Sequence, residues 1–376
     1  MKLTDICDVQ GGSQPPKEEW SFEEQEGYIR MLQIRDFTQS EKVIPEYIKV
    51  SNSTKTCEVD DILIARYSAS IGKILTGLAG AYNVAIMRTV PDTSKVQKRY
   101  LYYYLKSPYF QNAILNVGSR AAQAGFNKED LSKLEIKCPA LIDQGEIVSV
   151  LEKVESVIQK RKQELQLLDN LIKARFVELF VGKKYEIVKA GSIIKEMRNG
   201  VSPSTSGGHF EKVLTLSAIT QGKFDDKAWK EGFFTDCPSA EKRITEDDFY
   251  ICRGNGNKSL VGMGVYALEN RPDLVFPDTV IAAHIDTERM VLPYLWIMWQ
   301  QPEVRKQLES GARTTNGTYK INQKVISEIK IICPPINEQE VFADFVKQVN
   351  KSKVKVQKAL DETQKLFDSL MQQYFG

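Results

Sequence analysis

The segment CPALIDQGEI at residues 138–147 stands immediately before a long run of helical periodicity, and CPPINEQEVF at residues 333–342 stands before a second such run. Each segment begins with a Cys-Pro dipeptide, and the proline prevents a helix from extending backwards. A capping-box pattern follows it. The capping-box pairs are Asp143 with Glu146 and Asn337 with Glu340. The two segments therefore predict two long helices that begin near residues 141 and 336.

Apolar residues recur at alternating spacings of four and three through both runs, as in the seam of a coiled coil. The first seam comprises Ile147, Leu151, Val154, Ile158, Arg161, Leu165, Leu168, Ile172, Arg175 and Leu179. The second comprises Phe342, Phe345, Val349, Ser352, Val356, Ala359, Thr363, Leu366 and Leu370. Because Gly182 and Gly376 close the two runs, each helix has about 40 residues and is about 55–60 Å long.

A helix of that length has no neighbours long enough to cover it in a small α+β domain, so we expect the two helices to pair with each other. Parallel and antiparallel pairs are both topologically possible. The expected arrangement is an antiparallel coiled coil, which relates the two halves of the chain by an approximate twofold axis.

Six short segments occur in the same order in both halves of the chain. The matched pairs are QGGSQP (10–15) with NGVSP (199–203), YIRMLQI (28–34) with EKVLTLS (211–217), DDILIAR (60–66) with DDFYICR (247–253), RYLYYYLKSP (99–108) with PYLWIMWQQP (293–302), GSR (118–120) with GAR (311–313), and CPALIDQ (138–144) with CPPINEQ (333–339). Arg66 and Arg253 differ by 187 positions and Cys138 and Cys333 by 195, a small drift that loop insertions produce. The order of the matches indicates an internal duplication.

Within each half, short β-rich runs alternate with Gly, Asn, Ser and Pro turns, which predicts a twisted sheet with helices. Two helical stretches are expected to be interrupted near Pro108 and Pro302. The fold class is therefore α+β, with two similar domains that are each followed by a long helix. The expected boundaries are 1–140 for domain 1, 141–182 for the first long helix, 183–335 for domain 2, and 336–376 for the second long helix.

Composition sets broad limits on function. The 376 residues carry 51 Lys and Arg against 49 Asp and Glu, so a nucleic-acid surface must come from local clustering of cations. The amino terminus lacks a secretory signal pattern and no apolar run is long enough for a membrane span, so we expect a cytoplasmic protein. Six scattered cysteines and two histidines make a metal site improbable.

The chain as a whole resembles the specificity (S) subunits of type I restriction–modification enzymes. The resemblance lies in the helix-start segments 138–147 and 333–342, in the preceding segments AGFNKEDLSKLEIKCP (124–139) and TYKINQKVISEIKIICP (318–334), and in the DDILIAR-type strands. It implies two target-recognition domains that each bind one half of a bipartite DNA site, with the paired helices fixing the gap. One departure is CRGNGNKSLVGMG (252–264), which is longer than its counterpart ARYSASIGK (65–73).

Polar loops that follow matched strands are the candidate DNA contacts. Arg66 and Arg253 end such strands, where a guanidinium could bind base edges or phosphates; the alternative is a salt bridge to Asp60 or Asp61 and to Asp247 or Asp248. The remaining candidates are Tyr67, Ser68, Ser70, Lys73, Arg120 and Gln123 in the first half, and Asn255, Asn257, Lys258, Arg313, Thr314, Thr315, Asn316 and Tyr319 in the second. His284, in VIAAHI, is expected to be a core or strand residue.

The sequence offers no catalytic constellation. Ser107-Pro108-Tyr109-Phe110 lacks one proline of a methyltransferase motif and is interpreted as a helix kink, and GNGNKS (254–259) departs from a phosphate-binding loop. The expected protein is a non-catalytic subunit that directs methyltransferase and restriction/translocase partners, with S-adenosylmethionine bound in the methyltransferase. Arg161 and Arg175 are candidate partner contacts. The alternatives are a recognition subunit of a type IIB-like enzyme and an adaptor whose helices only scaffold other proteins.

Overall fold

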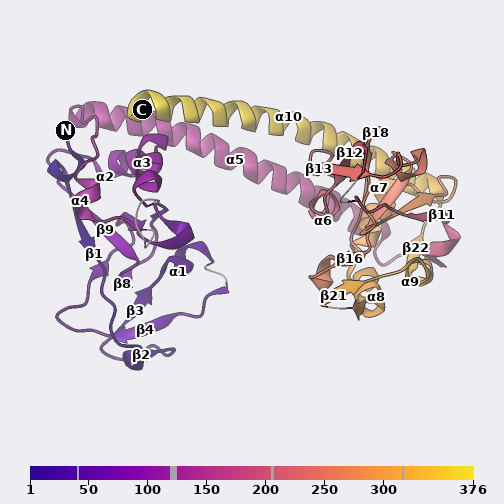
Figure 1. Ribbon diagram of the computed structural model, residues 1–376, viewed down its shortest axis with the longest axis horizontal. Coiled ribbons are helices and arrows are strands. Elements are labelled where there is room, and N and C mark those ends of the chain that lie inside the picture. Colours follow the sequence, from indigo (N-terminus) through magenta and orange to yellow (C-terminus); the bar gives the residue numbers. More distant parts are fainter. Residues whose placement is uncertain (40–41, 119–124, 205–206, 316) are drawn as a thin grey trace. The chain divides into compact units, whose positions relative to one another are not determined.

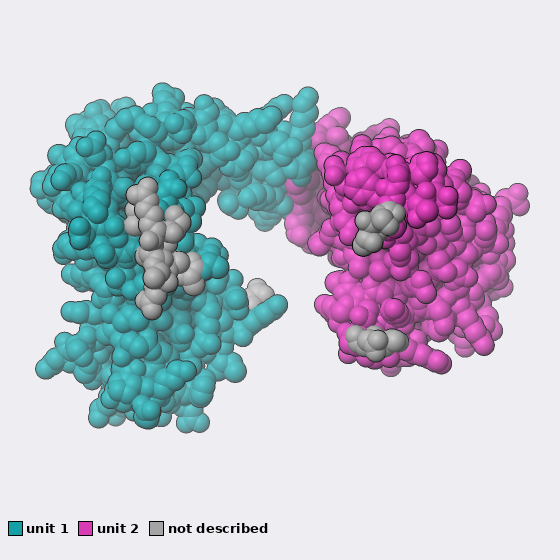
Figure 2. Space-filling view, viewed as in Figure 1, with its two compact units in different colours: residues 1–163, 357–376 teal, residues 164–356 magenta. Residues whose placement is uncertain are grey.

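The computed structural model of the chain describes residues 1–39, 42–118, 125–204, 207–315 and 317–376. The chain folds into two compact units (Figures 1 and 2). Unit 1 comprises Met1–Gln163 and Gln357–Gly376, and unit 2 comprises Glu164–Val356. Each unit therefore contains one α+β domain together with a segment of each long helix.

Two sheets form the β part of unit 1 (Figure 1). The first has the order β1-β9-β6-β7 and is antiparallel throughout. The second has the order β2-β4-β3-β8-β5, with β3 and β8 parallel. The bounds are β1 Cys7–Gly11, β2 Trp20–Ser21, β3 Tyr28–Leu32, β4 Glu46–Lys49, β5 Thr56–Cys57, β6 Leu63–Ala65, β7 Ile74–Leu75, β8 Gly80–Tyr82 and β9 Ile86–Pro91. The short helices are α1 Ile34–Thr38, α2 Lys98–Lys106, α3 Pro108–Gly118 and α4 Lys128–Leu131.

Unit 2 repeats this plan and adds two small sheets. The four sheets have the orders β11-β19-β15-β17, β13-β12-β18-β14, β10-β22 and β16-β21-β20. The bounds are β10 Glu186–Lys189, β11 Ile194–Asn199, β12 His209–Leu214, β13 Trp229–Phe234, β14 Arg243–Ile244, β15 Asp248–Cys252, β16 Gly254–Asn255, β17 Gly264–Tyr266, β18 Arg271–Val275, β19 Val280–Ile285, β20 Arg313–Thr315, β21 Thr318–Lys320 and β22 Lys330–Cys333. The short helices are α6 Ser217–Thr220, α7 Leu292–Trp299, α8 Pro302–Gly311 and α9 Gln323–Glu328. Each half thus holds more than the one sheet that we expected, because strand periodicity does not say which strands share a sheet.

The duplication is visible at matched glycines. The Gly12 amide donates to the Ile86 carbonyl at 3.2 Å, and the Gly200 amide donates to the Val280 carbonyl at 3.1 Å. A Cβ atom added to either glycine would lie 2.1 Å from a carbonyl oxygen, that of Asn83 in unit 1 and that of Pro277 in unit 2. Both halves therefore need glycine at this position, for the same close approach of two backbones.

The interrupted helices occur where prolines predicted them. Ser107 separates α2 from α3, and its hydroxyl accepts a hydrogen bond from the Phe110 amide at 3.3 Å. In unit 2, α7 ends at Trp299 and α8 begins at Pro302. The Ser-Pro-Tyr-Phe segment is thus a boundary between two helices, which confirms its interpretation as a kink.

The two long helices, α5 Leu141–Phe180 and α10 Ile336–Phe375, have 40 residues each. In unit 1 the first part of α5 shares a core with the last part of α10, through Leu151, Met371 and Phe375. In unit 2 the last part of α5 shares a core with the first part of α10, through Phe176 and Phe342. The start of each helix thus packs against the end of the other, so the pair is antiparallel (Figure 1). In the part of the chain that the structure describes, no helix is long and apolar enough to cross a membrane.

Two details of the predicted helices are wrong. Because α5 begins at Leu141 and α10 at Ile336, Asp143 and Asn337 lie inside the first turns and cannot be N-caps. In the seam of α10, Ser352 and Leu366 are exposed, and the residues after them, Lys353 and Phe367, are partly buried instead. A straight α-helix drifts by about 20° per heptad from a 3.5-residue repeat, which moves the buried face to neighbouring positions.

Candidate nucleic-acid interface

The loops that follow β6 and β15 are closed by the same backbone hydrogen bonds. The amides of Arg66 and Arg253 donate to the carbonyls of Ala85 and Thr279, each at 2.8 Å. The amides of Gly72 and Gly262 donate back to the last residues of the strands, Ala65 at 2.9 Å and Cys252 at 2.8 Å. Both glycines adopt a positive φ, 79° and 74°, which a residue with a side chain rarely adopts. The first loop spans residues 66–72 and the second residues 253–262, so the same anchor points hold loops of different length.

The side chains of Arg66 and Arg253 bind backbone carbonyls. Arg66 donates from Nε to the Phe126 carbonyl at 2.7 Å, and its guanidinium lies 4.9 Å from the centre of the Tyr67 ring. Arg253 donates from Nη1 to the Asp278 carbonyl at 3.1 Å. Neither arginine forms the salt bridge that was the alternative interpretation, and the buried carboxylates Asp61 and Asp248 pair with other cations.

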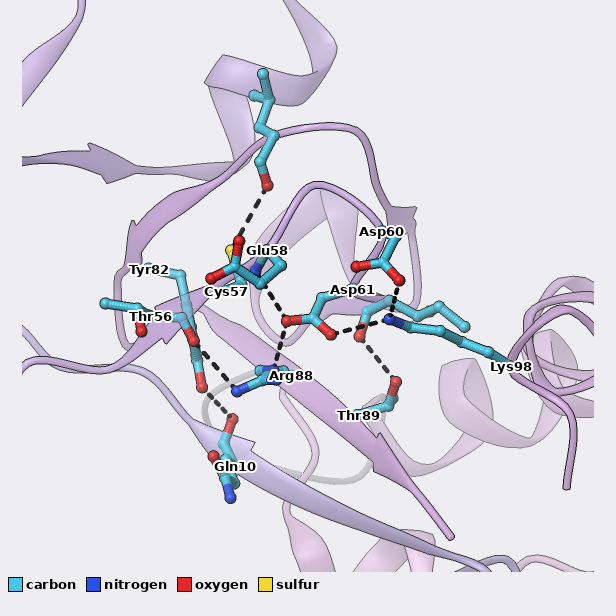
Figure 3. Close-up of polar contacts among 12 residues, drawn as sticks. Gln10, Thr56, Cys57, Glu58, Asp60, Asp61, Tyr82, Arg88, Thr89 and Lys98 are labelled. Carbon is cyan, nitrogen blue, oxygen red and sulfur yellow. Dashed lines mark hydrogen bonds and ion pairs between the residues drawn. The ribbon is translucent and has the colours of Figure 1, made fainter. Parts of the chain in front are cut away.

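Asp61 is one of those carboxylates (Figure 3). Its Oδ2 lies 2.7 Å from Arg88 Nε and accepts from the Glu58 amide at 2.9 Å, and its Oδ1 accepts from Lys98 Nζ at 3.2 Å. Lys98 also binds the exposed Asp60 at 2.9 Å. Burial raises the pKa of the Asp61 carboxyl, but the hydrogen bonds and the two cations outweigh it and hold the pKa below its ordinary value. This cluster joins the segment before β6 to β9 and α2.

Asp248 takes the matched position in unit 2. It is fully buried, forms an ion pair with Arg198 of β11, and lies 3.2 Å from His284 Nδ1. His284 lies opposite Asp248 in the register of β19 and β15. The prediction that His284 is a strand residue is therefore confirmed.

The structure brings together most of the predicted DNA contacts of unit 2. Asn255 of β16 and Thr314 of β20 both pair with Tyr319 of β21, which lies between them. Lys258 Nζ lies 6.0 Å from the centre of the Tyr319 ring. We call β16-β21-β20 with the loop 253–262 the donor sheet, because its exposed arginine, lysine and asparagine side chains carry hydrogen-bond donors. Arg313, Thr314, Lys258 and Asn257 are exposed on it, and Asn255 and Tyr319 are partly exposed.

Several residues that sequence reasoning missed hold the loop of the donor sheet in place. Arg305 of α8 donates from Nη2 to the carbonyls of Ser259 at 2.8 Å and Val261 at 3.0 Å, and burial lowers the pKa of its guanidinium. Trp299 of α7 donates from Nε1 to the Gly262 carbonyl at 2.8 Å. In unit 1, Gln111 of α3 donates to the Gly72 carbonyl at 2.9 Å. In both units a helix that follows the sheet in the chain supplies a side-chain donor to a loop carbonyl. The spacing of residues in the sequence does not predict such a contact.

The predicted contacts of unit 1 are described in part. Tyr67 forms an isolated bridge with Gly125, so the loop after β6 lies against the chain that precedes α4. Lys73 is exposed and Ser70 is partly buried. Of Ser68 and Thr315 the structure describes only the backbone, in a 3-10 turn and at the end of β20 respectively. Arg120, Gln123 and Asn316 lie outside the described residues.

The two candidate partner-binding arginines lie on α5. Arg175 donates from Nη1 to Glu178 Oε2 at 2.8 Å, and its guanidinium lies 5.8 Å from the centre of the Phe345 ring. Arg161 is partly buried, as expected for a seam position. Their role in partner binding stays a prediction. Within the described ranges, no group of three or more His, Cys, Asp or Glu side chains could hold a metal ion.

Comparison with known proteins shows which family the chain resembles. Residues 1–168 match the model of the type I restriction modification DNA specificity domain. The predicted resemblance to type I specificity subunits is thereby confirmed.

Relatives of the specificity-subunit family match well beyond the first domain. The type I restriction enzyme StySPI specificity subunit of Salmonella potsdam is 21% identical over 68% of this chain, and the match spans 58% of that relative. The chain thus covers little more than half of that protein's length. The MjaVIII specificity subunit of Methanocaldococcus jannaschii is 20% identical over 90% of this chain and 84% of its own length. A putative type I restriction enzyme MjaX specificity subunit of the same organism is 23% identical over 89% of this chain and 80% of its own length.

Solved structures share the fold of a specificity subunit. A chain from a study of complex assembly and conformational transition of the type I R-M system has a TM-score of 0.59 and 15% identity, covering 100% of this chain and 96% of its own. The S subunit of the type I restriction–modification system from M. genitalium has a TM-score of 0.54 and 14% identity, covering 100% and 95%. At such low identity, these two matches show the fold alone.

Proposed function

We propose that this chain is the DNA-binding specificity subunit of a type I restriction–modification system and that each unit binds one half of a bipartite target. The observation that carries the proposal is the repeated loop: in both units an arginine starts a polar loop, and the same two backbone hydrogen bonds close it. Loops held on a rigid sheet are where binding residues concentrate. The family of residues 1–168 names DNA specificity as the role of such a domain.

Charge and chemistry on the donor sheet support contact with DNA. Residues 253–262 and 313–320 contain Arg253, Lys258, Arg313 and Lys320 and no aspartate or glutamate. Such a local excess of cations attracts phosphates even though the whole chain has a net charge of only +2. The aromatic ring of Tyr319 and the asparagine amides add groups that suit base edges.

In this proposal the chain itself catalyses nothing and works in the cytoplasm with other subunits. A partner methyltransferase binds S-adenosylmethionine and modifies the site, and a restriction/translocase subunit joins the same complex. Arg161, Arg175 and the outward faces of α5 and α10 are the surfaces proposed for these partners. The paired helices are proposed to set the gap between the two half-sites.

The proposal is tested by exchanging residues 1–140 for the matching domain of another such subunit. We expect the complex with the partner methyltransferase to change one half of its methylated target and to keep the other half and the spacer, because the two units fold around separate cores. Mapping methylated bases in cells that carry both proteins gives the result. A change in both half-sites, or in neither, would contradict the proposal that each unit binds one half-site independently.

A second measurement separates a specificity subunit from an enzyme and from a scaffold. The purified chain should transfer no tritiated methyl group to target DNA, whereas the chain with its partner should do so. Gel shifts with target and scrambled duplexes, with and without the partner, give the binding result. Methyl transfer by the chain alone would contradict the non-catalytic role, and a lack of sequence-dependent binding by the complex would favour a protein-scaffolding adaptor.

A further inference from the structure

We infer that unit 2 recognises its half-site mainly through guanine, by hydrogen-bond donors that the donor sheet presents to acceptors in the major groove. The inference rests on the proposed function, which it deepens by naming the kind of base. It follows from the hydrogen bonds that the two loop asparagines already make, from the cations around them, and from the way the loop is fixed.

The carbonyl oxygens of the two asparagines are occupied within the loop. Asn255 Oδ1 accepts from the Asn257 amide at 2.8 Å. Asn257 Oδ1 accepts from the Ser259 amide at 3.0 Å and from the Ser259 hydroxyl at 2.9 Å. A backbone amide can only donate, so each of these bonds fixes which end of the side-chain amide is oxygen. The Nδ2 groups remain, and neither has a partner among the described residues.

This geometry removes the usual contact with adenine from Asn257. That contact needs both ends of the side-chain amide, because the oxygen accepts from adenine N6 while the nitrogen donates to N7. Asn257 Oδ1 uses both of its lone pairs within the loop, so Asn257 offers a donor alone, whereas Asn255 Oδ1 accepts one bond and keeps one lone pair. To a pair of neighbouring donors guanine presents two acceptors in the major groove, N7 and O6, whereas adenine and thymine each present only one, N7 and O4.

The neighbouring side chains add further donors. Arg313 and Lys258 are exposed cations, and Lys320 is exposed at the end of β21. Arginine and lysine contacts to guanine O6 and N7 are the commonest base-specific contacts to DNA. No carboxylate occurs in residues 253–262 or 313–320, so these segments lack the side chains that most often accept from the amino group of cytosine.

The loop is fixed, so the asparagines keep these roles. Arg305 and Trp299 bind its carbonyls from the helices behind it, and Gly262 closes it with a positive φ. Freeing Oδ1 of Asn257 for a base would leave the Ser259 amide without its acceptor. The matched loop of unit 1, RYSASIGK (66–73), contains no asparagine, so the inference applies to unit 2 alone.

The test uses the full chain in complex with its partner methyltransferase and the target found by methylation mapping. Exchange of residues 183–335 identifies the half-site that unit 2 reads. In that half-site each guanine is replaced in turn by 7-deazaguanine, which lacks the N7 acceptor, and by inosine, which keeps N7 and O6 and lacks only the minor-groove amino group. We expect at least one 7-deazaguanine to weaken binding by about 5- to 100-fold and inosine at the same place to change it by less than about twofold.

A matched variant connects the effect to the loop. Asn257→Asp keeps an oxygen to accept from the Ser259 amide and removes the Nδ2 donors. We expect it to weaken binding and to reduce the 7-deazaguanine penalty, as in a double-mutant cycle. Gln221→Glu makes the same charge change at an exposed position after α6 and should keep the penalty.

The outcomes separate the inference from the function. Sequence-specific binding in which no guanine of the unit 2 half-site responds to 7-deazaguanine, or in which inosine is as harmful, overturns the inference and leaves the specificity role intact. An unchanged 7-deazaguanine penalty in both Asn257→Asp and Asn255→Asp also overturns it. A wild-type complex without sequence-dependent binding contradicts the proposed function itself.

Discussion

Gln144 and Gln339 make the same set of hydrogen bonds in the two halves of the molecule. Each side chain is fully buried in the first turn of a long helix. Its oxygen accepts a hydrogen bond from one backbone amide, and its nitrogen donates hydrogen bonds to two backbone carbonyls. The bonds are Gln144 with the Gln97 amide (2.8 Å), the Lys95 carbonyl (2.8 Å) and the Pro139 carbonyl (2.9 Å), and Gln339 with the Val291 amide (3.1 Å), the Arg289 carbonyl (3.1 Å) and the Pro334 carbonyl (2.8 Å). One glutamine in each half thus fastens a long helix to the segment that enters α2 or α7.

Replacing Gln144 by alanine should destabilise unit 1. The change leaves one amide and two carbonyls without their partner, and each buried polar group that loses its hydrogen bond costs about 1–3 kcal/mol. Urea denaturation followed by circular dichroism gives the free energy of unfolding. Gln163→Ala, at an exposed position of the same helix, is the matched control and should stay within about 0.5 kcal/mol of wild type. If the two variants unfolded at the same urea concentration, the hydrogen bonds of Gln144 would not stabilise the attachment of the helix.

Gly200→Ala should destabilise unit 2 by about 1–3 kcal/mol or more, because the added Cβ would lie 2.1 Å from the Pro277 carbonyl oxygen and the backbone would have to move. Gly208→Ala is the control, since no atom lies within 4 Å of its added Cβ. Thermal unfolding of both variants gives the comparison. If Gly200→Ala and Gly208→Ala unfolded at the same temperature, the close approach of the two backbones at Gly200 would not be required for stability.

Asp61→Asn should lower stability at pH 7 by about 1.5–3 kcal/mol, the usual worth of hydrogen bonds to a charged group. The pKa of Asp61 is lowered in the folded protein, so the carboxylate stabilises the fold above its unfolded pKa of about 4 and loses that effect as the pH falls through its folded pKa. The difference between variant and wild type should therefore shrink below about pH 4. Asp60→Asn, at a carboxylate whose side chain is 79% exposed, should cost less than about 1 kcal/mol. If the stability difference between Asp61→Asn and wild type instead grew as the pH was lowered, the lowered pKa of Asp61 would be contradicted.

Lengthening both long helices should lengthen the spacer of the target. One heptad inserted after Gln163 in α5 and one after Val356 in α10 keep the pairing register and add about 10 Å at 1.5 Å per residue. At about 3.4 Å per base pair, methylation mapping should then find a gap about three base pairs longer, with both half-sites unchanged. A heptad in α5 alone shifts α5 against α10 and should destabilise the pair. If the variant with both insertions were folded and active but kept the original spacer, the helices would not set the spacer. They would then serve only as a docking surface for partner subunits.

Local signals in the sequence were enough for the elements and the repeat, while contacts that depend on register were not. The proline before each long helix and the apolar spacing placed α5 and α10, but the sequence did not show that β16 and β21, which carry Asn255 and Tyr319, pair on one small sheet. The partners of Asp61 needed the pairing of β6 with β9, which sets Arg88 opposite Leu63. The role of Gln144 could not be predicted from its repetition in the sequence, because two of its partners, Gln97 and Lys95, precede it by nearly fifty positions.

The shared anchors of the two loops bear on how such a protein could diversify. Arg66 to Gly72 and Arg253 to Gly262 leave and re-enter the sheet through equivalent backbone hydrogen bonds, although the second loop has three more residues. Closing a loop of ten residues rather than seven costs only about 0.3 kcal/mol in chain entropy. Insertions and deletions between these anchors are therefore nearly neutral for the fold, and natural selection can change the length and chemistry of the loop while the supporting framework stays constant.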